Sequence, residues 1–516
     1  RAALRTNDKK LRKYRLALSC TAEYGNIFAG SSGTTAQKKA RILAQMNITM
    51  TRVNGIYERD LAITLELIPN NDLLIYYGSV NSDPWEDEYN EQTENMIDAK
   101  IVSANYDIAH NFNTTGGCNA GCIGCVCTPG SKGSAFTGRA DPTGDAFDVD
   151  YVAHEMGHQF GGYHVQSNYS CRSGSGKSEV EPGSGSSIMG YAGICAPDVQ
   201  KSSDAYFNYV NIRDISANIQ RGVSAGCAQI ITIANSPPTA NAGPDYSIPK
   251  STAFVLKGKG SDPDGDALTY CWEQNDPEDP NSDGVPLPFR VAGPMFRSRA
   301  ATASPNRYFP EMSKVVANNL TPTWEVIPSV ARKLNFALTV RDNKAGGGQT
   351  SDDLMKVTVS GTAGPFIVIY PSSPTTWGVG TSQTISWDVA GTNAAPINCQ
   401  KVNILLSTNG GFAYPVTLAA NVPNDGSQSI IVPNNISAKC RVKIEAADNI
   451  FFDISNANFT ISNNVTCTAT VPKGFTASAI TATSALANWN PILGATFEVQ
   501  YRVKGTTAWT LLAVSP

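Results

Sequence analysis

The sequence predicts a multidomain protein in which an α/β region with a twisted mixed sheet precedes all-β immunoglobulin-like sandwich modules. Two observations indicate this fold class. Helical and strand patterns alternate up to about residue 225, and beyond Pro237-Pro238 only strand patterns remain. The chain has 516 residues, and at about 150 residues per domain this length predicts three or four domains. A hydrophobic content of 41% is typical of well-buried cores.

The α/β region is expected to begin with five elements. They are a strand at residues 14–20, a helix at 35–54, strands at 61–68 and 73–77, and a helix at 91–103. The first helix carries apolar residues at near-helical spacing, namely Ile42, Leu43, Met46 and Met50. This order is typical of a mixed sheet with helices packed on it. A closing helix is expected over residues 204–219.

One stretch, from His154 to His164, follows the pattern H-E-x-x-H-x-x-G-x-x-H. On a helix, residues four apart share one face, so His154 and His158 can bind one metal ion. Gly161 permits a left-handed turn that brings His164 back as a third ligand. Three nitrogen ligands leave a fourth tetrahedral position open, which is typical of a catalytic zinc site.

The alternative is that these histidines only decorate the surface. The chain holds four histidines, three of them in this stretch and the fourth at position 110, which favours a metal site. Glu155 follows the first ligand and can reach a metal-bound water. Zinc lowers the pKa of that water and polarises a carbonyl. We therefore expect Glu155 to take the proton as general base and to deliver it to a leaving amine.

Together with Ser187-Ile188-Met189-Gly190-Tyr191 downstream, this motif resembles the metzincin metalloendopeptidases. Within them, residues 149–153 and 52–59 resemble reprolysin-like bacterial secreted proteases, and the resemblance covers about residues 10–225. It implies a metzincin-type catalytic domain over residues 1–230, with Met189 in a Met-turn beneath the histidines. It also implies that Tyr191 ligates zinc at rest and then hydrogen-bonds the oxyanion. The alternative for Tyr191 is a packed turn aromatic.

The resemblance further implies an edge strand that forms the upper rim of the cleft. Residues 133–138 are the candidate, because an edge strand can accept a peptide by β-augmentation. The alternative for this segment is a Gly-rich hairpin arm. Protein or peptide substrates are the expected partners.

Three modules are expected after the linker. Residues 231–360 resemble a polycystic-kidney-disease (PKD) or cadherin-like β-sandwich with an insertion at 273–330, and residues 361–465 form a second β-sandwich. Residues 466–516 resemble part of a fibronectin type III module, which we expect to be truncated. Asp262, Asp264 and Asp266 form either a calcium site or a plain Asp/Gly turn. These modules are candidates for binding other proteins or glycans.

The cysteines and the net charge indicate where the protein is located and which partners it can have. Four cysteines between residues 118 and 127 indicate disulfides or, as the less favoured alternative, a second zinc site. Pairing is also expected between Cys171 and Cys195, and between Cys399 and Cys440. Disulfides favour a secreted or cell-surface protein. The net charge of −4, without a basic stripe, argues against nucleic acid. No apolar run approaches the roughly 18 residues that span a membrane.

The opening residues, Arg1-Ala2-Ala3, lack a signal peptide, so a processed or truncated N-terminus and an absent prodomain are expected. The sequence thus predicts a secreted zinc-dependent endopeptidase. The alternative is an adhesin or carbohydrate-binding surface protein with a vestigial protease domain, which the intact Glu155 disfavours. Because domain interfaces within a chain are often modest and polar, residues 1–230 are expected to fold alone.

The first prediction tests the third ligand. His164→Ala is expected to lower both zinc affinity and activity, because two histidines then remain. His110→Ala, outside the motif, is expected to change neither strongly. Metal content measured by atomic emission on both variants tests whether His164 is a ligand. Equal zinc loss in the two variants would mean that the zinc site has been assigned to the wrong residues.

Overall fold

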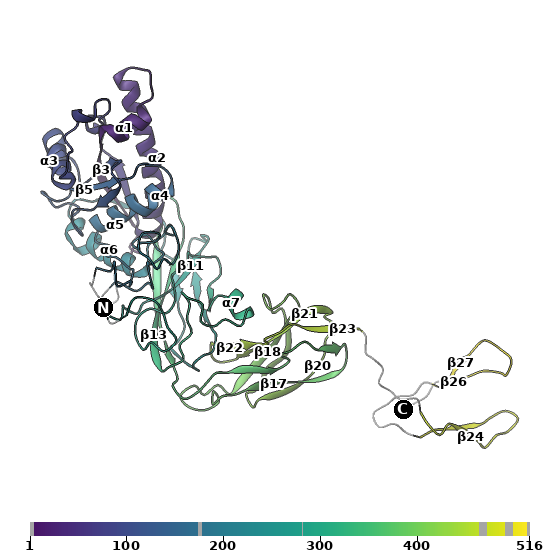
Figure 1. Ribbon diagram of the computed structural model, residues 1–516. Helices are drawn as coiled ribbons and strands as arrows, with labels where there is room; N and C mark the ends of the chain where they lie inside the picture. The colour runs from purple at the N-terminus through teal and green to yellow at the C-terminus, as the bar shows by residue number, and fades with distance from the viewer. Residues whose placement is uncertain (1–4, 174–177, 281, 464–471, 491–498, 513–516) are drawn as a thin grey trace.

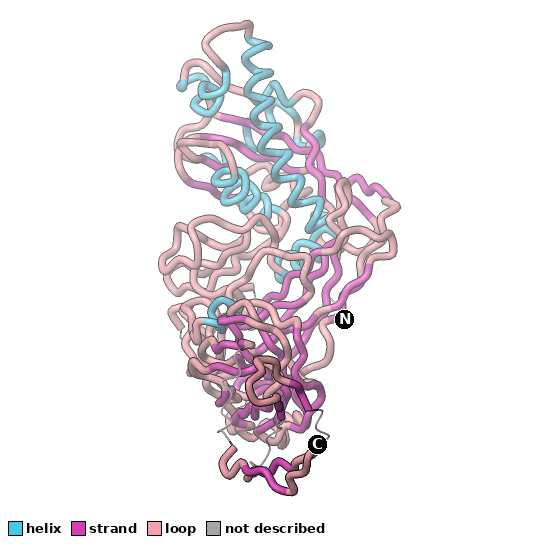
Figure 2. Tube along the Cα trace, turned by 90° about the vertical axis from the view of Figure 1, so that its right-hand side faces the viewer, coloured by secondary structure: helices cyan, strands magenta, loops and turns pink. Residues whose placement is uncertain are grey.

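The computed structural model describes residues 5–173, 178–280, 282–463, 472–490 and 499–512. Figure 1 shows the helices gathered at one end, followed by β-units along the chain. We call residues 5–230 the N-terminal unit, 231–360 the second unit and 361–463 the third unit. Figure 2 shows the same division, with helix concentrated in the N-terminal unit. Within the described residues, the helices are all too short or too polar to span a membrane.

A six-stranded mixed sheet organises the N-terminal unit. Its strand order is β2-β1-β3-β5-β4, with β6 also paired to β1. Strands β1, β2, β3 and β5 are parallel neighbours, whereas β4 and β6 run antiparallel to theirs. The strands are β1 (Lys10–Cys20), β2 (Ile63–Leu67), β3 (Ile108–Asn113), β4 (Gly117–Asn119), β5 (Ala135–Gly138) and β6 (Gln229–Thr232). The predicted mixed sheet is confirmed.

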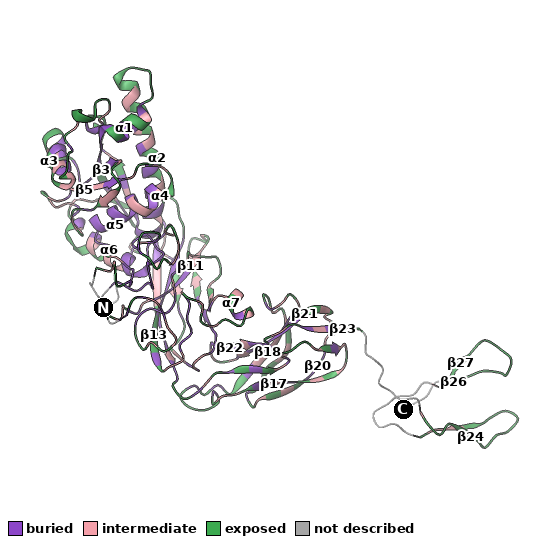
Figure 3. Ribbon diagram, viewed as in Figure 1, coloured by how far each residue is buried: buried purple, intermediate pink, exposed green. Residues whose placement is uncertain are grey.

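Helices cover this sheet largely where the sequence predicts them. They are α1 (Ala22–Ala29), α2 (Thr35–Leu61), α3 (Tyr89–Ile101), α4 (Asp145–Phe147), α5 (His154–Gln159) and α6 (Tyr209–Arg221), with a π-helical turn, η4 (Asp148–Ala153), before α5. The side chains of Thr34 and Gln37 form a capping box that starts α2. This helix runs beyond the predicted residue 54, and Ala62 in the left-handed conformation ends it. Figure 3 shows α5 buried and parts of α2 and α3 exposed.

Two sequence predictions about this sheet are wrong. The strand expected at 73–77 is reduced to a single bridge between Ile75 and Cys20, and residues 71–74 form a short 3-10 helix. There the buried Asn71 amide accepts from the Leu18 N–H and donates to the Leu18 carbonyl, both at 2.8 Å. The second concerns the rim of the cleft. β5, inside residues 133–138, lies between β3 and β4, so β4 is the edge strand.

The second unit is built from sheets around an aromatic core, and their strand pairs are antiparallel except for β14 with β8. A four-stranded sheet has the order β11-β13-β14-β8, and β9 pairs with β12 and β7 with β10. The predicted insertion, residues 273–330, belongs to this core, because the rings of Phe296 and Phe309 pack against those of Phe254 and Phe336. The elements are β7 (Thr239–Asn241), β8 (Tyr246–Ile248), β9 (Phe254–Lys257), β10 (Lys259–Ser261), β11 (Thr269–Gln274), β12 (Asn306–Phe309), α7 (Met312–Val316), β13 (Arg332–Arg341) and β14 (Thr350–Val359).

The third unit is a two-sheet sandwich with orders β15-β17-β20 and β16-β23-β21-β18-β19, where β22 also pairs with β21. Trp377 packs on Phe459 in its core, with ring centroids 4.3 Å apart. Cys399 and Cys440 are free, contrary to the expected bridge. The strands are β15 (Ile367–Tyr370), β16 (Thr376–Gly378), β17 (Ser382–Asp388), β18 (Lys401–Ser407), β19 (Val416–Pro423), β20 (Ser427–Ile431), β21 (Ser437–Ala446), β22 (Phe452–Ile454) and β23 (Phe459–Ser462).

The last segment contains two hairpins within its described residues. They are β24 (Thr476–Ser478) with β25 (Leu486–Asn488), and β26 (Val499–Tyr501) with β27 (Thr510–Leu512). Cys467 and Phe497, which carried part of the predicted fibronectin-like pattern, lie outside the described residues. We propose the predicted boundaries at 230, 360 and 465 as the domain boundaries.

The contact between the N-terminal and second units is buried and charged. Arg341 of β13 pairs with Asp60 of α2 at 2.8 Å, and the two side chains are 1% and 0% exposed. This partner helps to hold the pKa of the fully buried Asp60 at about 2. Trp324 packs against Gly183, where a Cβ would meet the indole ring at 2.7 Å. The contact is polar, but its ion pair is buried, so the N-terminal unit alone would lose one of the two arginine partners of Asp60. Independent folding of residues 1–230 stays a prediction.

The second prediction concerns Glu273 of β11. Its Oε2 accepts from the backbone N–H of Tyr209, the first residue of α6, while its Oε1 is buried without a hydrogen-bond partner among the described residues. Burial raises the pKa of Glu273 to about 8 from an ordinary 4.5. The unfolded chain therefore ionises first as pH rises. The contribution of the protonated Glu273 to stability is fully present below about pH 4.5. It is lost progressively as pH rises from there through about 8.

Glu273→Gln removes this loss, because the amide stays neutral. The free energy of unfolding of the variant, relative to wild type, is expected to rise from pH 5 to pH 8, by at most about 1.4 kcal/mol per pH unit. If the substituted amide lowers stability by an amount that does not depend on pH, that amount does not affect this slope. Urea unfolding at several pH values measures it, with the exposed Glu91→Gln as matched control. Parallel pH profiles for wild type and Glu273→Gln would contradict the assignment.

Candidate metal centre

Three imidazole nitrogens converge at the end of α5. The Nε2 atoms of His154, His158 and His164 lie 2.9–3.2 Å from one another. The Nδ1 of His154 lies 2.7 Å from the Ile188 carbonyl oxygen, and that of His158 lies 2.7 Å from the Gly162 carbonyl oxygen. Each Nδ1–H can donate to its carbonyl, which leaves the Nε2 lone pairs directed at one another.

This donor set fits zinc. Three lone pairs at such separations repel unless a cation lies between them, and zinc takes nitrogen ligands at about 2.0–2.1 Å. Burial lowers the pKa of His158 to about 4 and that of His164 to about 3, and it lowers the pKa of His154 well below its ordinary value. All three rings are therefore neutral near pH 7, as metal ligands must be.

Two glycines allow this arrangement. Gly157 lies between the ligands on α5, and a Cβ there would meet the Met189 sulfur at 2.5 Å. Its absence lets the fully buried Met189 pack directly beneath the helix, as a Met-turn residue would. Gly161 has φ +105° and donates to the His158 carbonyl at 2.8 Å, so it makes the left-handed turn that the motif predicted. Gly157 occupies a variable position of the motif, so the motif itself did not indicate its role.

His110, on β3, is a core residue away from the ligands. Its ring nitrogens lie 3.1 Å from the Gln159 Oε1 and 2.8 Å from the Thr137 hydroxyl oxygen, and the side chain is fully buried. Gln159 ends α5, so His110 supports the metal helix. We therefore expect His110→Ala to keep the metal ligands but to lower stability, which refines the prediction made from sequence.

Glu155 faces a cavity of about 480 Å³ beside the histidines. The lining includes His158, His164 and Tyr191, and on the opposite rim Cys118 to Ile123. Glu155 is 5% exposed, and burial raises its pKa to about 7. The nearby Cys118 thiol and Ala120 N–H act in the opposite direction and lower this pKa. Cys118 stands on the edge strand β4, so the edge strand and the expected base are in contact. The sequence pattern showed Cys118 only as one member of a cysteine cluster.

Tyr191 closes the other side of the metal centre. Its ring centroid lies 4.5 Å from that of His164 and 5.6 Å from that of His154. Burial raises the pKa of its phenol to about 12, so the O–H remains a hydrogen-bond donor near neutral pH. The structure thus brings together all the residues that the motif and the Met-turn predicted.

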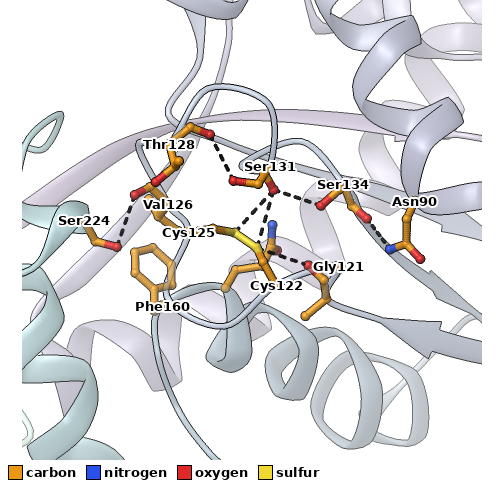
Figure 4. The surroundings of a disulfide bond; sticks show 12 residues. Asn90, Gly121, Cys122, Cys125, Val126, Thr128, Ser131, Ser134, Phe160 and Ser224 are labelled. Carbon is orange, nitrogen blue, oxygen red and sulfur yellow. Dashed lines mark hydrogen bonds between the residues drawn. A yellow bond between two sulfur atoms is a disulfide. The ribbon is translucent and has the colours of Figure 1, made fainter.

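Disulfides frame the cavity. Cys122 pairs with Cys125 on the rim, Cys127 pairs with Cys227 after α6, and Cys171 pairs with Cys195 as expected. Figure 4 shows the rim loop, where the Ser131 carbonyl lies within hydrogen-bond distance of both sulfurs of the first pair. Three of the four clustered cysteines are thus oxidised and Cys118 is free, which does not support the second zinc site.

Asp262, Asp264 and Asp266 lie in the second unit, outside this centre. Their carboxylates gather within 4.8 Å, and Asp262 accepts the backbone N–H groups of Asp264 and Asp266. Lys344 pairs with Asp266 at 2.9 Å and neutralises part of the charge. These contacts are typical of an Asp turn, and calcium there stays a prediction.

The fold and the site of the N-terminal unit define a metallopeptidase-like region. Residues 11–224 match the model of the reprolysin-like metallopeptidase family M12B. No curated protein sequence matches the chain.

Three solved structures resemble parts of the chain with low TM-scores. A glucan-utilization protein of Bacteroides ovatus, SGBP-B, solved with a mixed-linkage heptasaccharide, is 12% identical over 44% of this chain and 48% of its own, with a TM-score of 0.13. The chain thus spans about half of that protein's length. A chimeric titin Z1Z2 is 9% identical over 45% of this chain and 99% of its own, at 0.15. Chicken CNTN1 domains FN1–FN3 are 11% identical over 54% and 85%, at 0.14. These likenesses are too weak to carry an argument.

The third prediction tests Tyr191. If its hydroxyl stabilises the transition state, Tyr191→Phe lowers kcat far more than it changes KM, by roughly 10²-fold or more. A packing role predicts that rate and melting temperature both barely change, because phenylalanine keeps the ring. Steady-state kinetics, melting temperature and zinc content on this variant decide between the two. An unchanged kcat would remove Tyr191 from the catalytic residues.

Proposed function

We propose that this protein is a secreted zinc-dependent endopeptidase that hydrolyses internal peptide bonds of proteins. One observation carries the proposal. Three neutral histidine nitrogens converge beside the buried carboxylate of Glu155. The histidine cluster and the carboxylate face the same open cavity. The reprolysin-like match over the same residues supports it. His154, His158 and His164 would hold the zinc ion.

The roles of the chain's own residues follow from their positions. When bound, zinc supplies Lewis acidity that activates water and polarises a carbonyl. Glu155 accepts the proton of the attacking water and returns it to the leaving amine nitrogen. Its raised pKa suits both steps near neutral pH. The Tyr191 O–H donates to the oxygen on which negative charge develops.

The edge strand β4 provides a place where an extended peptide substrate can bind. β4 pairs with β5 on one side only, so its other edge can take a peptide backbone as an added strand. Glu155 lines the same cavity as Cys118 and Ala120 and therefore lies next to this edge. A polypeptide laid along β4 would therefore pass the general base, which favours cleavage within a chain.

An extracellular location is part of the proposal. Three disulfides lie in the N-terminal unit, and disulfides persist in oxidising surroundings. The alternative function is an adhesin or glycan-binding protein with a vestigial protease region. The residues of the site do not support this alternative. Glu155 and all three ligands are present, although only catalysis needs the carboxylate.

The fourth prediction is the test. Wild type is expected to hydrolyse casein or gelatin, and a zinc chelator should abolish this. Glu155→Gln is expected to keep zinc and fold but to lose turnover by about 10²- to 10⁴-fold, since it removes only the base. The exposed Glu86→Gln is the matched control. Retention of more than about a tenth of wild-type kcat in Glu155→Gln would falsify the role.

A further inference from the structure

A second hollow of about 180 Å³ adjoins the metal centre. Tyr191 lines both cavities, so the hollow opens beside the expected oxyanion position. Its wall also includes Tyr151, Ala192 and Ile194, and two basic side chains reach it, Arg139 and Lys201. Nothing in the proposed mechanism uses these basic groups.

The sheet places this hollow on one side of the scissile bond. Arg139 directly follows β5, whose last residue Gly138 pairs with Gly117, the first residue of β4. A peptide that adds antiparallel to β4 runs from Asn119 toward Gly117, and antiparallel pairing is the more stable kind. Cys118, Ala120 and Glu155 line the same cavity, so a scissile bond next to Glu155 lies opposite β4. The residue that follows that bond therefore comes to lie beside Arg139.

The basic groups there lack carboxylate partners. Arg139 donates to the Asp141 backbone carbonyl at 3.1 Å, and among the described residues neither it nor Lys201 makes an ion pair. Asp150 is the acidic residue of the wall, and its carboxylate accepts the Ser203 N–H at 2.8 Å. Arg139 thus keeps guanidinium donors available, in a geometry suited to a carboxylate.

We propose that this hollow binds an acidic side chain, Asp or Glu, immediately after the scissile bond, with Arg139 as the specificity-determining residue. The inference rests on the proposed endopeptidase function and specifies its substrate class. Selection by the apolar part of the wall, Tyr151 and Ile194, would favour a leucine or an aromatic residue at that position and is the competing outcome.

The fifth prediction tests this with peptides. Cleavage sites in a peptide mixture are mapped by mass spectrometry, and the best substrate is then made with Glu, Gln, Lys or Leu after the cleaved bond. Wild type is expected to prefer Glu over Gln by roughly 5- to 30-fold in kcat/KM, with Lys poorer still. High salt should reduce this preference, because the hollow is partly open to solvent.

Charge reversal provides the variant arm. Arg139→Glu is expected to invert the order of the Glu and Lys peptides, whereas Arg221→Glu, the same change at an exposed site of the same unit, keeps the wild-type order. Arg139→Gln, which is expected to level the two peptides, serves if Arg139→Glu does not fold. Equal rates for Glu and Gln in wild type, a preference for Leu, or an unchanged order in the Arg139 variants would overturn the inference.

Failure of the inference and failure of the function are distinguishable. If wild type cleaves all four peptides equally and Glu155→Gln cleaves none, only the acidic preference fails. If wild type with zinc cleaves no peptide, or if Glu155→Gln cleaves as fast as wild type, the proposed function fails and the inference falls with it.

Discussion

Three imidazole lone pairs that meet in a buried space are the constraint on which the rest of this structure depends. Neutral imidazole nitrogens about 3 Å apart are unfavourable without a cation between them, because their lone pairs repel. The surroundings hold them in place nonetheless. The Ile188 and Gly162 carbonyls fix two rings, and Met189 supports the helix through the missing Cβ of Gly157. A site held in this way against repulsion is built for a metal ion.

The second unit is part of this support. Arg341 neutralises Asp60 at the end of α2 and also donates to the Phe207 carbonyl, and Phe207 packs next to Gly157. Ser298, in the insertion, accepts from Ser186 two residues before Ile188. A β-module that looks separate in the sequence thus contacts the floor of the metal centre. Breaking its buried ion pair would cost more than breaking a surface contact, because the buried Asp60 would keep only one of its two arginine partners, Arg59.

The sequence predicted much of the fold and most of the site. The helices and the mixed sheet followed from apolar periodicity, and the ligands followed from one local motif. The prediction from sequence failed near residues 71–74, where a 3-10 helix held by a buried asparagine amide stands in place of part of a strand. It also failed for the edge of the sheet. Strand order depends on pairing between distant segments, and a short strand such as Gly117–Asn119 gives almost no periodic signal.

What the sequence determined by itself is the candidate ligand set, His154, His158 and His164, with Glu155 beside them. Those positions lie within one helix and one turn, where helical geometry alone fixes the spacing. Only the tertiary structure decided that Cys118 contacts Glu155, that Arg139 borders the cleft and that Arg341 neutralises Asp60, 281 residues away. Contacts over such separations are set by sheet register and by packing between units, and no local pattern of residues encodes them.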